Sequence, residues 1–123
     1  METSVNNKCR AFTSLEQSRK LAEILPLESA DIVYLASAEE DDGETLYTAE
    51  YKSEVIIYEA DDYINCWSLV ALLNVLPNYQ LQTQDDGIGI LCSCNGKFNI
   101  VTADNPIDAC YELIIKLHEQ NLL

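Results

Sequence analysis

Three segments of the chain carry apolar residues at the spacing of an α-helix. Residues 13–25 have such a stripe behind Thr13 and Glu16, a pair with the spacing of a capping box. Residues 65–76 are apolar on nearly every face, which is typical of a buried central helix. The third segment begins at Asp104 or Asn105, two capping residue types just before a proline. Its apolar stripe consists of Ile107, Cys110, Ile114 and Leu117.

Shorter segments between these helices have the pattern of β-strands. Residues 31–36, 46–51 and 54–59 are rich in β-branched and aromatic side chains, and the last two are expected to pair as a hairpin. Residues 79–84 alternate glutamine with other side chains, which is the period of a half-buried strand. The acidic residues 39–44 are expected to form a turn or an exposed loop, because they carry too much charge for the interior of an element.

The dipeptide Asn95-Gly96 is the strongest local signal. Both residue types adopt the positive φ angles of a type I′ turn, so residues 88–94 and 97–102 are expected to pair as a two-residue hairpin. This register places two pairs on the face away from Cys92 and Cys94: Leu91 with Ile100, and Ser93 with Phe98.

Together these elements predict an α+β fold. At 123 residues the chain is long enough for one compact core. We expect a flexible lead-in over residues 1–12 and a single domain over 13–123. That domain should hold a mostly antiparallel sheet of about five to six strands with two to three helices.

The net charge of the chain narrows the classes of molecule that it is expected to bind. The chain has 21 acidic and 7 basic residues, a net charge of −14, which disfavours direct binding to nucleic acid and to anionic membranes. Hydrophobic residues make up 48% of the chain, so the acidity does not indicate disorder. With no pattern of a signal peptide or membrane span, and with an odd number of cysteines, we expect a cytoplasmic protein with free thiols.

The acidic residues are unevenly distributed. Residues 28–62 contain many acids against Lys52 alone, whereas residues 63–84 carry no charge. This pattern predicts one local acidic face, either solvated or in contact with a basic protein partner. The expected face consists of Glu39, Glu40, Asp41, Asp42, Glu44, Glu59, Asp61 and Asp62.

Motifs for metal, cofactor or catalytic chemistry are incomplete. Cys92 and Cys94 share a strand face, but a tetrahedral site needs four ligands and the only histidine, His118, lies on the last helix. Asp41-Asp42-Gly43 and Asp85-Asp86-Gly87 lack the ligand spacing of a calcium loop and indicate ordinary turns. We therefore predict no metal, no cofactor and no catalytic residue.

Three segments together resemble a family of uncharacterised small proteins that are carried by prophages and mobile elements of gut anaerobes. They are residues 13–21 with Ala30-Asp31, residues 66–77 (Cys-Trp-Ser-Leu-Val-Ala-Leu-Leu-Asn-Val-Leu-Pro), and residues 104–110 (Asp-Asn-Pro-Ile-Asp-Ala-Cys) with 117–119. The resemblance implies an intracellular bacterial setting and carries over no catalytic residue.

The function expected from these observations is a non-enzymatic accessory protein of phage or mobile-element type that binds another protein through its acidic face. One alternative is a small enzyme or small-molecule binder with a pocket near Trp67 and His118. Another is a nucleic-acid mimic that inhibits a protein with a basic groove. Self-association through residues 46–59 or an apolar helix face is a third alternative, and the oligomeric state stays open.

Overall fold

The structure is a computed structural model that describes residues 11–41, 44–54, 63–85 and 87–123, with the side chains of 37–41 and 44–46 excepted. Its elements are α1 (Leu15–Ala22), the 3-10 turn η2 (Leu27–Ser29), β1 (Ile32–Asp41), β2 (Glu44–Tyr51), the 3-10 turn η3 (Lys52–Glu54), β3 (Tyr63–Cys66), α2 (Leu69–Val75), β4 (Tyr79–Gln84), β5 (Gly87–Cys94), β6 (Lys97–Ala103) and α3 (Pro106–Glu119).

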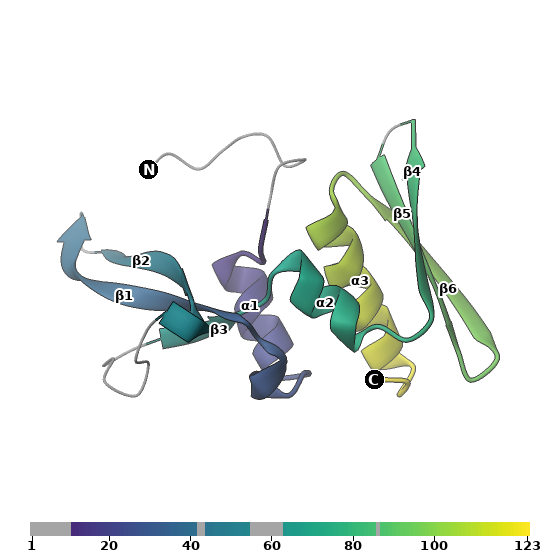
Figure 1. The fold of residues 1–123 in the computed structure, drawn as a ribbon, viewed down its shortest axis with the longest axis horizontal. Helices are drawn as coiled ribbons and strands as arrows, with labels where there is room; N and C mark the ends of the chain where they lie inside the picture. The colour runs from purple at the N-terminus through teal and green to yellow at the C-terminus, as the bar shows by residue number, and fades with distance from the viewer. Residues whose placement is uncertain (1–10, 42–43, 55–62, 86) are drawn as a thin grey trace.

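The fold is α+β, as expected, and its described strands form two antiparallel sheets. One sheet has the order β2-β1-β3 and the other β4-β5-β6. The helices lie in the middle of the molecule between the two sheets (Figure 1). No helix among the described residues is long and apolar enough to cross a membrane.

The first sheet corrects the prediction for the acidic segment. β1 extends to Asp41 and β2 begins at Glu44, so most of residues 39–44 lie in strands and not in a loop. The strand register shifts between Ala36 and Glu40, which lets the ladder continue into the charged segment. Cross-strand pairing therefore outweighs the low strand propensity of the acids. Residues 46–51 were expected to pair with residues 54–59. In the structure β2 pairs with β1, and residues 55–59 lie outside the described part of the chain.

The second sheet confirms the hairpin at Asn95-Gly96. Both turn residues have positive φ angles, 51° and 79°, as a type I′ turn requires. The register is the expected one, with Leu91 opposite Ile100 and Ser93 opposite Phe98.

Two helix starts differ from the sequence prediction. The capping box of α1 is formed by Ser14 and Gln17, whose side chains each accept a 3.1 Å bond from the other residue's backbone N–H. Thr13 is instead fully buried, and its hydroxyl lies 2.7 Å from that of Ser18. The segment expected to begin a helix at residue 65, with Asn65 or Ser68 as its cap, first completes β3; Ser68, the second of these candidates, then caps α2. The Asn105 cap of α3 is confirmed.

The hydrophobic core lies mainly between α3, α2 and the inner face of β5. The expected stripe of α3 is fully buried, as are Trp67 and Leu72 from the second helical segment and Ile90 from β5. Burying one such large side chain stabilises the fold by roughly 1.5–3 kcal/mol. The periodic apolar positions are thus fold determinants.

A buried polar cluster joins the first sheet to the helices. The hydroxyl of Thr13 accepts a 3.2 Å bond from the backbone N–H of Trp67, while the Thr13 carbonyl accepts a 2.6 Å bond from Tyr34. Asp31 accepts bonds from the backbone N–H and the hydroxyl of Ser68 at 2.9 and 2.5 Å. This cluster fixes where β3 ends and α2 begins.

Candidate functional site

The acidic face expected from the sequence cannot be placed on this structure. Glu39, Glu40, Asp41 and Glu44 lie in β1 and β2, but their side chains are outside the described part. The other members of the predicted face lie wholly outside the described residues: Asp42, Glu59, Asp61 and Asp62.

The structure does not give Trp67 and His118 the setting of a shared pocket. Trp67 is 0% exposed and donates its indole N–H to the hydroxyl of Ser29 at 2.9 Å. His118 is exposed in the last turn of α3, with Nδ1 3.3 Å from the carbonyl oxygen of Leu123. None of the hollows described below is lined by either residue.

The described cysteines behave as core residues. Cys66, Cys92 and Cys110 are buried, and Cys94 is half-buried beside them on the inner face of its sheet. Burial raises the pKa of the Cys66 and Cys92 thiols and raises that of Cys110 to about 12. These thiols stay protonated at neutral pH, which makes them poor nucleophiles. The described residues contain no cluster of side chains fit to hold a metal ion.

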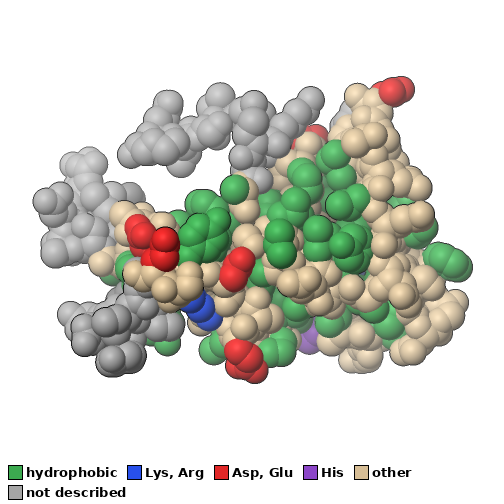
Figure 2. Space-filling model, in the orientation of Figure 1, with side chains coloured by type: hydrophobic (Ala, Val, Ile, Leu, Met, Phe, Trp, Pro, Cys, Tyr) green, Lys and Arg blue, Asp and Glu red, His purple; other side chains and the backbone are tan. Residues whose placement is uncertain are grey.

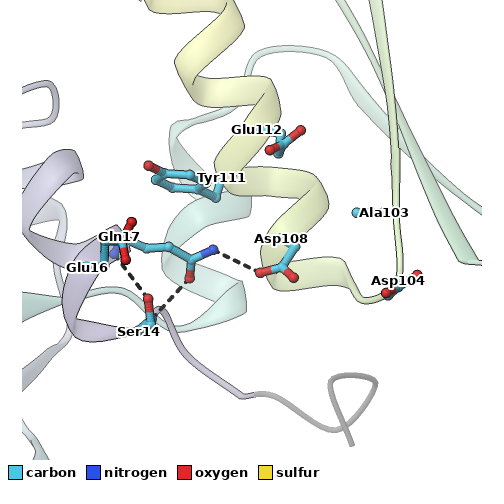
Figure 3. A pocket seen from close by; sticks show the side chains of 8 residues that line it. All are labelled: Ser14, Glu16, Gln17, Ala103, Asp104, Asp108, Tyr111 and Glu112. Atoms are coloured by element: carbon cyan, nitrogen blue, oxygen red, sulfur yellow. Dashed lines mark hydrogen bonds between the residues drawn. The ribbon is translucent and has the colours of Figure 1, made fainter.

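The most distinctive concave surface lies along α3. A hollow of about 500 Å³ is walled by the start of α1, by the end of β6 and by the first turns of α3 (Figure 3). Four carboxylates line it, together with Ser14, Gln17, Ala103 and the ring of Tyr111. These carboxylates belong to Glu16, Asp104, Asp108 and Glu112. No Lys or Arg side chain of the described residues lines this hollow.

Hydrogen bonds hold the walls of the hollow in place. Gln17 donates a 2.8 Å bond from α1 to Asp108 of α3, as Figure 3 shows. Asp108 also accepts a 2.9 Å bond from the Asn105 side chain and donates its backbone N–H to Asn105 at 2.9 Å. The capping groups of both helices therefore fix the acidic end of the hollow.

A second hollow, of about 660 Å³, lies next to the first one. The two share Tyr111 and Glu112, and we call the two adjoining hollows together the α3 groove. Its second half is lined by apolar residues, including Val101 and Ile115, and by Lys20, Lys116 and Glu119. The groove thus has an acidic end, an apolar middle and a mixed-charge end.

The environment of the groove changes the pKa of Tyr111. Burial, and after it the negative charges of Glu16 and Glu112, raise the pKa of this phenol. The phenol therefore remains neutral at physiological pH beside these two carboxylates. A lysine or arginine side chain that entered the acidic end would meet carboxylates and an aromatic ring together.

Exposed apolar side chains gather elsewhere as well. Figure 2 shows hydrophobic side chains over the middle of the molecule, where α2 and α3 lie in Figure 1, with the described carboxylates scattered. Val70 of α2 is 65% exposed. Phe98 and Ile100 are 72% and 53% exposed on the face of β6 that points away from α3. The surface therefore offers apolar contacts beside the groove.

The sequence reasoning missed the α3 groove because its walls come from distant segments. Glu16 is separated from Asp104 by most of the chain, and neither position belongs to a dense acidic run. The one local signal was the pair of helix starts, at Ser14 and at Asn105, since first turns of helices favour acidic residues.

Comparison of the chain with protein-family models, with curated proteins and with solved structures finds no match.

Proposed function

We propose that this chain is a non-enzymatic protein-interaction module that binds a basic segment of a partner protein in the α3 groove. The observation that carries the proposal is the acidic end, where four carboxylates and Tyr111 surround one hollow with no described basic side chain in its lining. A charge-assisted bond between a lysine or arginine and such carboxylates is about twice as strong as a neutral one.

The apolar middle of the groove supports a polypeptide partner more than a simple cation. Val101 and Ile115 continue the groove beyond Tyr111, at the place where neighbouring side chains of a bound segment would lie. Interfaces commonly combine an apolar, aromatic centre with a polar rim. The thiols of Cys66, Cys92 and Cys110, buried and protonated, add support for a non-enzymatic role. For the biological setting we propose a cytoplasmic accessory protein of a phage or mobile element, on the strength of the resemblance above.

Affinity capture from bacterial lysate with matched charge variants tests this function. Glu112→Lys reverses a charge in the groove, and Glu23→Lys makes the same change at an exposed residue that does not line it. We expect wild type and Glu23→Lys to retain the same proteins at low salt, and Glu112→Lys to lose them. The captured proteins should be released when salt is added, because salt screens exposed charge pairs.

Two outcomes would overturn the proposal. One is capture of the same proteins by wild type and both variants, because the groove charge would then play no part. The other is absence of any protein retained specifically by wild type at low salt. A nucleic-acid mimic would instead capture nucleases or DNA-binding proteins whose retention does not depend on Glu112.

A further inference from the structure

The free edge of β4 distinguishes this strand from the other edges of the two sheets. β4 pairs only with β5 among the described strands, and all six of its side chains are exposed. Its sequence, Tyr79–Gln84, has no charge and no proline, and its register against β5 is unbroken. Folded proteins usually protect an exposed edge with charge, proline or a bulge. β4 has none of these protections.

The other described edges are protected or short. β6 begins with Lys97 and flanks the α3 groove, β2 carries Glu50 in its described part, and β3 has four residues. A strand that pairs with another chain needs a long, regular row of free backbone groups. β4 is the described edge that best provides such a row.

The register shows which backbone groups of β4 face outward. The Asn78 carbonyl accepts a 3.3 Å bond from the N–H of Ser93, so residue 78 faces β5. Backbone groups alternate along an antiparallel strand, so the even residues 80, 82 and 84 also bond to β5. The N–H and C=O groups of Tyr79, Leu81 and Thr83 therefore point away from the sheet. The two-residue hairpin agrees with this assignment. Its closing pair, Cys94 and Lys97, is hydrogen-bonded, so the even residues of β5 bond to β6 and its odd residues bond to the even residues of β4.

We infer that β4 pairs antiparallel with β4 of a second copy of this chain, about a two-fold axis at Leu81. In this register Leu81 faces its own copy, and Tyr79 faces Thr83 of the second copy. All three outward-facing residues of each strand then form hydrogen-bonded pairs. The two sheets become one continuous sheet that keeps α3 on the same face in both copies.

Side-chain exposure fits this arrangement. Tyr79, Leu81 and Thr83 point toward the α3 side of the sheet, but α3 packs on β5 and β6 and leaves Leu81 41% exposed. Pairing would bring the two Leu81 side chains together on that side. On the other side, Gln80 would lie opposite Gln82 of the second copy, where their amides can bond to one another.

Charge favours a second copy in the antiparallel direction. Each chain carries −14, so two copies repel unless they meet where neither is charged, and β4 supplies such a segment. The nearest described acid is Asp85, which follows the strand. Antiparallel pairing at Leu81 separates the two copies of Asp85 by about 27 Å, far beyond the Debye length of roughly 10 Å at 0.1 M salt. Parallel pairing would place them side by side.

Sedimentation velocity of the full chain over a wide range of concentration tests the inference. We expect a reversible dimer of twice 13.8 kDa that strengthens as salt is added, because salt screens the repulsion. Leu81→Lys places two positive charges at the axis and should weaken the dimer by about tenfold or more. Val70→Lys adds the same charge at an exposed position away from β4 and should leave the dimer unchanged.

Leu81→Pro provides a second variant. It removes an outward-facing N–H while breaking no bond to β5, so circular dichroism should show a folded chain that no longer dimerises. Amide exchange gives the register: Leu81 should become protected as concentration rises, whereas Gln80 and Gln82 are protected throughout. A monomer at every concentration, or a dimer insensitive to both Leu81 variants, would overturn the inference. This inference does not rest on the α3 groove, because Glu112→Lys should abolish partner capture and leave the dimer intact.

Discussion

Thr13 shows how a single residue acquires a role that local sequence does not reveal. Its spacing to Glu16 is that of a capping box, yet Ser14 forms the cap. The hydroxyl of Thr13 is taken by the backbone N–H of Trp67, 54 positions along the chain, and by Ser18. A buried N–H needs a hydrogen-bond acceptor. Because Thr13 supplies that acceptor to Trp67, the neighbouring Ser14 caps the helix.

Thr13→Val should therefore destabilise the fold more than Ser14→Ala. Valine keeps the shape of threonine but leaves the buried Trp67 N–H without its acceptor, which costs about 1–3 kcal/mol. Ser14→Ala removes one partly exposed cap, at about 1 kcal/mol. Urea unfolding of both variants measures the difference. An equal or smaller loss for Thr13→Val would show that the buried cluster contributes no more than the cap.

Cys110 gives the fold a sensitivity to alkaline pH. Its pKa is raised to about 12 by burial, from an ordinary value of 9.0. Between these values the thiol ionises in the unfolded chain but not in the folded one, so stability falls as pH rises. Cys110→Ala should make that fall shallower by about 1.4 kcal/mol per pH unit. Unfolding measured at pH 9 to 11 checks this, and identical slopes in both proteins would refute it.

At the level of elements, the best predictions rested on signals contained within one segment. The Asn95-Gly96 turn fixes the β5–β6 register by itself, and Asn105 with the following proline begins α3. The acidic segment 39–44 was predicted wrongly because its strands depend on pairing with each other. The α3 groove was not predicted, because one of its walls comes from α1, which is distant in sequence from β6 and α3.

Two glycines of the second sheet should respond differently to alanine. Gly96 has a φ of 79° and open space around it, so Gly96→Ala costs only backbone strain, about 1–2 kcal/mol. A Cβ at Gly87 would overlap the carbonyl oxygen of Ala103, so Gly87→Ala must also move the strand and should cost more. Thermal unfolding of both variants tests this order. A more damaging Gly96→Ala would contradict the structure of the β5–β6 edge.

For the whole molecule, the charge of −14 has two separate consequences. It limits contact between copies to uncharged segments, of which β4 is one. We propose that it also favours basic partners at the α3 groove, where capping side chains of α1 and α3 hold the carboxylate of Asp108. The sequence alone assigned the preference to a face made of acidic residues from 39–44 and 59–62, whose side chains lie outside the described part. The proposed binding of a basic partner therefore has two candidate sites, the α3 groove and the acidic face predicted from the sequence.

The most direct test is a nuclear magnetic resonance titration of the labelled chain with a synthetic peptide that alternates lysine and leucine. The α3 groove predicts saturable shifts at Glu16, Tyr111 and Ile115 that persist in Glu23→Lys and disappear in Glu112→Lys. Shifts confined to residues 39–62, or shifts at the groove that Glu112→Lys leaves unchanged, would contradict the proposed binding site.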